Sequence, residues 1–404
     1  MAKLNLRKRG SKWEYRFQIG IIDGKRKYET KSGFRTKKDA EQAGNLAMTE
    51  YNLTGKVIKE KEISFSDYLD LCMKLYCKAN TKDTSIQGYE KKIRLYIKPA
   101  LGHYPLKSLT ASILQEFINK LFNDGMSRAT LSNIKGILSN SLSYAVQPLE
   151  YIHNSPMVHV TLPKKGAVPE NPTKNSPHFY IPNSDIDKIL ERFPEGSSAH
   201  LPLILGYKCG LRLGEAYGIT WDNIDFENSK LTVNKQIQWH EKSKKDKTDT
   251  SYWYITAPKY NEIRTIDVDK QLITLLKNIK KQQEVHKKEY DDLYVKNYVS
   301  KNKQIINNTG DGTEFDFVCI RECGELIKPG TMQHTSKVIH ELGIDFTFHS
   351  LRHTHCTMLL EAGADVKYVQ KRLGHKNVKV TMQTYLHLTE SMSKKGCDIL
   401  NSMY

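Results

Sequence analysis

Several features that define other classes of protein are missing from this 404-residue sequence. It has no run of about 18 apolar residues, so a membrane-spanning helix is not expected. The first residues, MAKLNLRKRG, lack the apolar core of a secretory signal, which favours a cytoplasmic location. A Walker-type phosphate loop and clustered carboxylates are also missing, which agrees with a chemistry that needs neither ATP nor a metal ion.

Cysteine is scarce, and its spacing excludes two common scaffolds. The chain has seven cysteines, an odd number, at spacings that match no disulfide framework, so reduced thiols are expected. Cys319 and Cys323 lie close together, but no second Cys or His pair stands at the spacing of a zinc finger. Thiols around a turn are the favoured interpretation, and no metal site is predicted.

Acidic residues are too few to balance the basic ones. The sequence has 62 Lys and Arg residues against 45 Asp and Glu, a formal net charge of +17. A positive field of this size attracts polyanions and speeds their association. DNA or RNA is therefore the favoured partner, with an anionic membrane surface as the alternative.

Residues 1–55 have the pattern of a small basic domain. Trp13, Tyr15, Phe17 and Ile19 alternate along one strand, and a turn at DGK leads to a second. The segment GFRT leads towards a third strand or a turn, and Thr36 is the expected cap of a helix. Up to residue 62 there are 16 Lys or Arg and 8 Asp or Glu, so these strands are expected to contact DNA, with a merely solvated basic face as the alternative. The candidate DNA contacts are Lys12, Arg16, Lys25, Arg26 and Lys27.

Residues 63–160 predict a compact domain of four helices. Pro99 is expected to end the second helix, while Thr110 caps the third and Gly125 stops it. Five prolines within residues 156–178 then predict an extended linker. The candidate DNA contacts in the helical domain are Lys91, Lys92, Arg128 and Lys135.

Residues 179–404 predict a mixed domain that is mainly helical and carries a small antiparallel sheet. Strands are expected over 229–240, 251–259 and 263–268, followed by one long polar helix over 270–299. Three more helices close the domain. The whole chain is thus predicted to be a multidomain α+β protein.

The segment HSLRHTHC near the end of the chain carries the first chemical signal. His349 and Arg352 are three residues apart, so they share one face of a helix. His349 and His353 have the spacing of a helical zinc pair, but no Glu lies between them, and an arginine repels a cation. The planar fork of Arg352 instead suits a phosphate.

A phosphate site of this kind needs a second cation and a nucleophile. Arg212 begins a predicted helix, and Glu215 stands one turn later, where it can brace the arginine. Two arginines can neutralise the charge that grows in a pentacoordinate transition state. Tyr385 follows His375 by ten residues, and its phenol, with a pKa of about 10, becomes a nucleophile when nearby groups take its proton. Any one of these residues, taken alone, is better explained by packing or a surface salt bridge.

The motifs CGLRLGE, TAPKYNEIRTIDV, HSLRHT, LGH and TYLHL, in this order, resemble the signature of the tyrosine recombinase family. The resemblance covers roughly the last 220 residues of the sequence. In layout, the whole chain resembles the integrases of phages and conjugative transposons. It implies an arm-type DNA-binding domain at 1–55, a SAM-like core-binding domain at 63–160 and a catalytic domain at 179–404.

The resemblance also implies a role for each matched residue, with no metal. It implies that Arg212 and Arg352 clamp the scissile phosphate and that Lys259 is a general acid. His349 would be an acid or base, and His375 would hydrogen-bond the phosphate. Tyr385 would be the nucleophile, and Glu215 would support the site.

The implied reaction is site-specific DNA recombination through a 3′-phosphotyrosyl intermediate, which integrates and excises a mobile element. One tyrosine per chain cuts one strand, so a homotetramer is expected on double-stranded DNA with core-type and arm-type sites. An excisionase or a DNA-bending protein stays open as an accessory partner. The alternatives are a type IB topoisomerase and a DNA-binding regulator without catalysis. His353 and His355 are expected to pack, or to form hydrogen bonds, within the domain.

Overall fold

The computed structural model of the chain describes residues 3–22, 25–54, 62–77, 83–163, 180–242, 250–308, 312–377 and 401. The chain divides into two compact units, Met1–Pro169 and Glu170–Tyr404. The predicted finer division into domains at 1–55, 63–160 and 179–404 stays a prediction.

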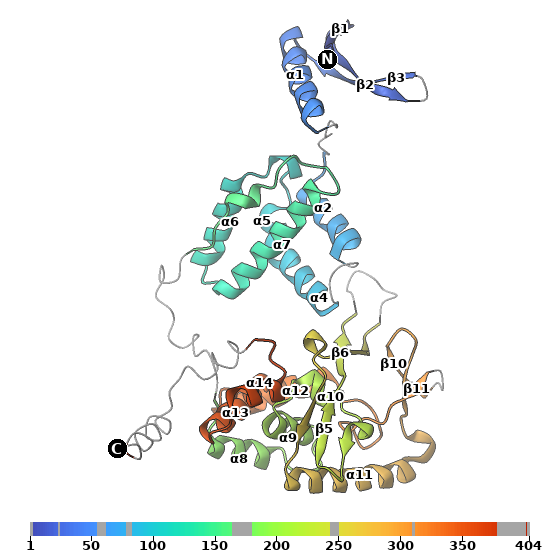
Figure 1. The fold of residues 1–404 in the computed structure, drawn as a ribbon, viewed down its shortest axis with the longest axis vertical. Helices are drawn as coiled ribbons and strands as arrows, with labels where there is room; N and C mark the ends of the chain where they lie inside the picture. The colour runs from blue at the N-terminus through green and yellow to red at the C-terminus, as the bar shows by residue number, and fades with distance from the viewer. Residues whose placement is uncertain are drawn as a thin grey trace. The chain divides into compact units, whose positions relative to one another are not determined.

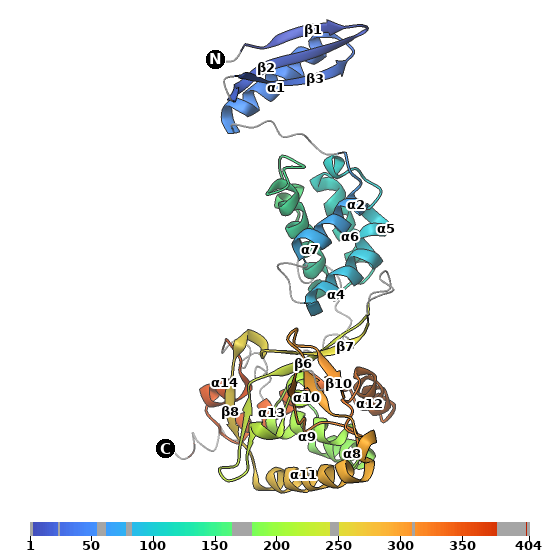
Figure 2. The same ribbon diagram turned by 90° about the vertical axis from the view of Figure 1, so that its right-hand side faces the viewer.

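The first unit begins with an antiparallel sheet in the order β1-β2-β3, and one helix lies along it in both views (Figures 1 and 2). Tyr15 and Phe17 of the middle strand are buried against the helix, as their alternation predicts. Thr36 caps that helix by accepting from the Asp39 N–H at 3.1 Å. The predicted sheet and helix are confirmed. The third strand precedes the other two, and GFRT ends β3 and turns towards α1. The bounds are β1 Asn5–Arg9, β2 Lys12–Ile22, β3 Lys25–Phe34 and α1 Lys37–Thr54.

The rest of this unit is helical and packs around one apolar core, which confirms the predicted four-helix arrangement. Ser64 and Thr110 cap two of the helices, and Gly125 follows the end of α6 with φ 81°. The helices are α2 Phe65–Cys72, the π turn η1 Met73–Cys77, α4 Asp83–Lys92, the π turn η2 Ile93–Ile97, α5 Lys98–Leu101, α6 Ala111–Asn123 and α7 Arg128–Val146. Two 3₁₀ turns are η3 Leu106–Ser108 and η4 Pro156–His159.

The predicted end of the second helix before Pro99 is wrong, because the helical run continues to Leu101. A proline removes one backbone donor and crowds the carbonyl four residues earlier. The wider π turn η2 comes directly before it, and the Lys98 N–H there donates to the Ile93 carbonyl, five residues back. This local widening accommodates the proline without ending the helix.

The second unit combines helices with three small antiparallel sheets, in the orders β4-β5-β8, β6-β7 and β10-β9-β11. α9 is buried on nearly all sides, and α13 packs beside it. The helices are α8 Asn183–Arg192, α9 His200–Cys209, α10 Leu213–Tyr217, α11 Lys270–Tyr290, α12 Pro329–Glu341, α13 Phe348–Glu361 and α14 Val366–Leu373. The 3₁₀ turns are η5 Trp221–Asn223, η6 Lys259–Asn261 and η7 Asp291–Leu293. The strands are β4 Ile224–Asp225, β5 Lys230–Val233, β6 Gln236–His240, β7 Tyr252–Thr256, β8 Arg264–Asp267, β9 Asn297–Val299, β10 Ile305–Asn307 and β11 Thr313–Glu314.

The mainly helical character and the antiparallel strands of this unit are confirmed, but two predicted elements are wrong in detail. The single strand predicted over 229–240 is two strands, β5 and β6, which pair with β8 and β7 in separate sheets. The long helix predicted over 270–299 ends at Tyr290, because Asp291 adopts a positive φ of 44° and the chain then turns into β9. No helix in the part of the chain that the structure describes is long and apolar enough to span a membrane.

Candidate active site

Arg352 lies at the centre of the candidate site, on the first turns of α13. Thr347 fixes the start of that helix by accepting from the Ser350 N–H at 3.2 Å. The Arg352 side chain is 1% exposed. Its Nη1 donates to the Gly210 carbonyl at 2.7 Å, and its Nη2 donates to the Leu373 carbonyl. One guanidinium therefore holds together two segments that are more than 160 positions apart in the sequence. The segment of Gly210 leads into Arg212, and the segment of Leu373 leads into His375.

Gly210 permits this close approach. It ends α9 in the left-handed conformation, with φ 65°, which glycine adopts without steric cost. A Cβ atom at this position would lie 2.5 Å from Leu373 Cδ2 and 2.9 Å from His355 Cδ2, closer than such atoms can pack. The glycine thus lets the start of α10 lie against the turn after α14.

Arg212 is held at the start of α10 by Glu215. The Glu215 carboxylate accepts from the Arg212 backbone N–H at 3.0 Å and from Arg212 Nη1 at 2.8 Å. Glu215 is completely buried. Burial alone would raise the pKa of its carboxyl, but hydrogen bonds and charge from Arg264, with the charges of Arg212 and Arg352, lower that pKa to about 2. Glu215 is therefore a carboxylate at neutral pH and partly balances the arginines.

Two arginines that were not predicted from the sequence complete this network. Arg264 on β8 donates to both oxygens of Glu215, at 3.2 and 2.7 Å, and its Nε donates to the Arg372 carbonyl at 2.8 Å. The signal for Arg264 was present, because it alternates with Ile266 and Val268 on the buried face of the strand. An arginine on such a face needs an acidic partner.

Arg372, the other of the two, donates through Nε to Nε2 of His355 at 3.0 Å. Burial is the main reason that the pKa of His355 falls to about 3, and the charge of Arg372 lowers it further. His355 is therefore neutral and packs within the unit, as was expected of it. Its neighbour His353 stacks edge-on against His349, with ring centroids 4.7 Å apart.

The two histidines at the site share the same electrostatic surroundings. Loss of hydration, followed by the charges of Arg352, Arg212 and Lys259, lowers the pKa of His349 to about 4. Loss of hydration and then Arg352, Arg212 and His349 lower the pKa of His375 to about 3. Both rings are neutral at pH 7, and the charges of Arg352 and Arg212 lower the pKa of each.

Lys259 lies in the turn η6, between β7 and β8, and its charge contributes to the lowered pKa of His349. Tyr260 and Asn261 in the turn have positive φ values of 66° and 57°, which are costly for residues other than glycine. Two ammonium groups lie near the Tyr260 ring, with Lys259 Nζ at 5.2 Å and Lys376 Nζ at 5.7 Å from its centroid. Contacts of this kind are attractive and limit where the lysines can point.

The structure therefore brings together the predicted residues Arg212, Glu215, Lys259, His349, Arg352 and His375. Tyr385, the predicted nucleophile, lies outside the described residues. Within the described ranges, no group of three or more His, Cys, Asp or Glu side chains is arranged to hold a metal ion.

The predicted DNA contacts of the first unit are mostly on its surface. Arg16 lies on the face of the sheet away from α1, with its guanidinium carbon 3.7 Å from the Tyr28 ring centroid. Arg128 is exposed and donates to the Pro163 carbonyl. The other exposed residues of this set are Lys12, Lys25, Arg26, Lys27 and Lys91, whereas Lys92 and Lys135 are half-buried. That they contact DNA stays a prediction.

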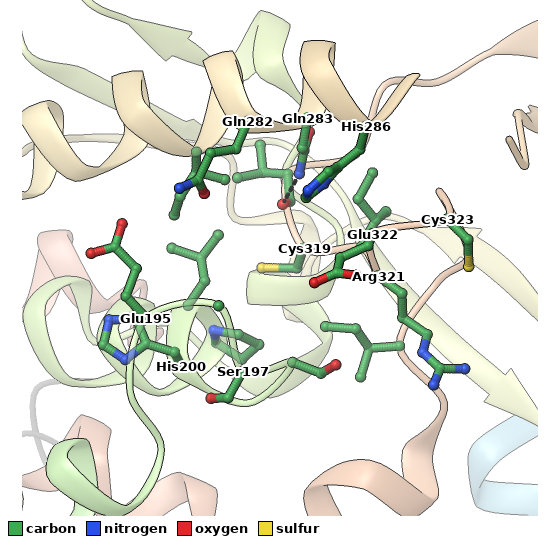
Figure 3. Close-up of a pocket in the computed structure, with 18 of the residues that line it drawn as sticks. Glu195, Ser197, His200, Gln282, Gln283, His286, Cys319, Arg321, Glu322 and Cys323 are labelled. Atoms are coloured by element: carbon green, nitrogen blue, oxygen red, sulfur yellow. Dashed lines mark hydrogen bonds between the residues drawn. The ribbon is translucent and has the colours of Figure 1, made fainter. Parts of the chain in front are cut away.

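A cavity of about 460 Å³ lies at the other end of α9 from Arg212 and contains none of the predicted site residues (Figure 3). Gln283 and His286 of α11 face it from one side, and His200 of α9 from another. Gln283 is tied to the fold, since it accepts from Trp221 Nε1 and donates to the Val318 carbonyl, both at 2.9 Å. The arginine site, in contrast, lies where Gly210 ends α9 and Arg212 begins α10.

Three protein-family models match successive parts of the chain. The phage integrase family matches residues 181–392, the N-terminal SAM-like domain of phage integrases matches 64–122, and an arm DNA-binding domain matches 5–46. A tyrosine recombinase XerC-like protein of Caldanaerobacter subterraneus subsp. tengcongensis is 27% identical over 92% of this chain and 90% of its own length. The ICEBs1 integrase of Bacillus subtilis is 23% identical over 85% and 84% of the two chains.

Solved structures show the same fold. A fragment of the Tn1549 transposon integrase, in complex with circular intermediate DNA, is similar with a TM-score of 0.60, 20% identity and coverage of 84% of this chain and all of that chain. A lambda integrase tetramer bound to a Holliday junction has a TM-score of 0.54 and 16% identity, with 94% of both chains covered. The family match and the relatives define an enzyme that breaks and rejoins DNA strands, a tyrosine recombinase. The chain belongs to the phage integrase family, the site-specific recombinases of mobile elements.

Proposed function

We propose that the chain integrates and excises the DNA of a mobile element through a 3′-phosphotyrosyl intermediate formed on Tyr385. The phenolic oxygen attacks the scissile phosphorus, a bond from phosphorus to tyrosine forms, and the bond from phosphorus to the 5′ oxygen breaks. The 5′ oxygen takes a proton and leaves as a hydroxyl. A 5′ hydroxyl from a second duplex then attacks the phosphotyrosine, which restores a phosphodiester and frees the tyrosine.

One observation carries the proposal, namely that Arg352 bonds both the Gly210 and the Leu373 carbonyls. These contacts bring Arg212 and His375 next to Arg352, although the three residues come from separate elements. Two guanidinium groups and an imidazole can then surround the non-bridging oxygens of one phosphate. Donors fixed in advance around developing charge are usually the largest single contribution to catalysis.

The proton transfers suit the charge states of the remaining residues. His349, whose pKa is lowered to about 4, is neutral at pH 7 and can accept the proton of Tyr385. His375 is neutral as well and can donate one N–H to a phosphate oxygen. Lys259 is exposed in the turn η6 and is the proposed donor to the departing 5′ oxygen.

Assembly follows from the reaction, since four strands must be cut to exchange two duplexes and each chain supplies one nucleophile. A tetramer on DNA is therefore proposed, like the lambda integrase tetramer that binds a Holliday junction. The first unit is proposed to grip arm-type sites through Arg16 and its basic neighbours, and core-type sites through its helices. An excisionase or DNA-bending protein is a proposed accessory partner.

The test traps the intermediate on a nicked DNA duplex, from which the cleaved fragment diffuses away. The natural protein should form a covalent adduct that survives denaturation, whereas Y385F should bind the same DNA with similar affinity and form no adduct. Y368F is the matched control, because Tyr368 is an exposed tyrosine on α14 that the proposed reaction does not use, and it should form the adduct normally.

Each alternative predicts a different result in the same experiments. Adduct formation by Y385F would remove that residue from the proposed role. A regulator without catalysis would give no adduct with either protein. A relaxing enzyme of the topoisomerase type would form the adduct but would not join two labelled duplexes, whereas an integrase should join them.

A further inference from the structure

Arg264 is a buried residue that contacts both Glu215 of α10 and the last turn of α14. The residue is 7% exposed. Its two Nη atoms each donate to one oxygen of Glu215, while its Nε donates to the Arg372 carbonyl in the last turn of α14. A Cβ atom on Gly374 would lie 3.3 Å from Arg264 Cδ and Nη1, so the turn before His375 rests on this guanidinium. The arginine is therefore fixed in both position and orientation.

The geometry at Glu215 shows what this fixed orientation can do. A bidentate arginine–carboxylate pair sets the plane of the carboxylate, because both oxygens must meet the fork. Glu215 Oε1, held in this way, also accepts from Arg212 Nη1 at 2.8 Å, and Oε2 accepts from the Arg212 N–H at 3.0 Å. Any rotation of the carboxylate would move the partner of Arg212 Nη1.

We infer that Arg264 is a positioning residue for strand cleavage, which orients Arg212 by fixing the plane of the Glu215 carboxylate. The inference rests on the proposed function, because it assigns Arg212 to the scissile phosphate. Arg264 itself is not expected to touch DNA. Its contribution is geometric, and a lysine in its place would keep the positive charge but could not meet both oxygens at once.

The substitution R264K separates charge from geometry. In R264K the buried carboxylate keeps a cationic neighbour but loses the second hydrogen bond that sets its plane. Arg212 is then free to rotate away from the phosphate, and small misplacements of catalytic groups can cost as much as about a hundredfold in rate. R321K is the matched control, because Arg321 is an exposed arginine of the same unit that pairs with Glu325 at 3.3 Å.

The assay measures the single-turnover rate of adduct formation by the full-length protein, with DNA affinity measured in parallel. Two nicked duplexes are compared, one with a normal scissile phosphate and one with a methylphosphonate, whose methyl group replaces a non-bridging oxygen and removes the charge. R264K should cleave the normal duplex about tenfold or more slowly than the natural protein, with affinity changed less than about twofold. On at least one methylphosphonate isomer, the cleavage rates of R264K and the natural protein should differ by only about twofold, because the charge that Arg212 neutralises is absent.

The possible outcomes are distinguishable. An equal loss on both substrates, or a parallel loss of DNA affinity, would assign Arg264 to general stability and overturn the inference, as would a normal rate in R264K. If R264K does not fold, R264M replaces it in the same assay, and failure of both variants to fold also overturns the inference. R212A tests the premise separately, because normal cleavage by R212A would contradict the proposed function itself.

Discussion

Replacing Glu215 by glutamine should weaken both the fold and the chemistry of the second unit. Glu215 is fully buried and accepts hydrogen bonds from Arg212 and from both Nη atoms of Arg264. A shift of its pKa from 4.5 to about 2 corresponds to about 3 kcal/mol of net attraction for the charged form. Glutamine has nearly the same shape but lacks the charge, and its NH₂ group would face a guanidinium donor. E215Q should therefore lower the free energy of unfolding by about 3 kcal/mol.

The pH dependence gives an independent test with a defined sign. The folded-state pKa of Glu215 lies below that of the unfolded chain, so the unfolded state binds the extra proton between these values. The stabilisation is complete above about pH 4.5 and is lost as the pH falls towards about 2. Urea unfolding of the natural protein and E215Q at several pH values measures this difference. The two stability curves should converge at low pH.

The result that would refute this reasoning is equally clear. If E215Q and the natural protein unfold with the same free energy at pH 7, the buried carboxylate does not hold the arginines as described. If the difference stays constant down to pH 2, the charge of Glu215 is not its cause. Cleavage should also slow in E215Q, because Arg212 Nη1 loses its fixed acceptor.

Three further predictions follow from separate features of the structure. G210A should destabilise the second unit by about 1–3 kcal/mol in urea unfolding and slow cleavage, because φ is 65° and the new Cβ would lie 2.5 Å from Leu373 Cδ2. An unchanged unfolding midpoint would argue against the close approach. The rate of adduct formation should show no acid-side loss from His349 until the pH falls towards 4, because its neutral form persists to that value, whereas a loss centred near pH 6.5 would contradict the lowered pKa. Affinity for arm-type DNA should fall as salt rises, and neutralising Lys25 or Lys27 should each reduce the slope of log affinity against log salt by about one if it contacts a phosphate.

Much of the site could be predicted from the sequence because its chemistry is concentrated in short motifs. His349 and Arg352 lie on one helix face, and the requirement for a second cation led to Arg212 with Glu215 beside it. The predicted small sheet, helical bundle and mixed second unit are confirmed. The strands and helices could be predicted from local periodicity, and the candidate site from residue types that bind phosphate.

The parts that were missed depend on contacts between distant segments. Arg264 donates to Glu215, 49 positions away, and Arg372 donates to His355, 17 positions away. No local sequence pattern indicates these pairs. The strand predicted over 229–240 was split because its two halves pair with different strands, β8 and β7. The helix through Pro99 continued because a π turn relieved the steric conflict that the proline creates.

The most direct test of the proposed chemistry is to locate the covalent bond between protein and DNA. The adduct trapped on a nicked duplex would be digested with protease and nuclease, and the modified peptide identified by mass spectrometry. We predict one modified residue, Tyr385, linked through phosphate to a 3′ nucleotide, and a free 5′ hydroxyl on the released strand. A link to any other residue, or to a 5′ phosphate, would contradict the proposed function.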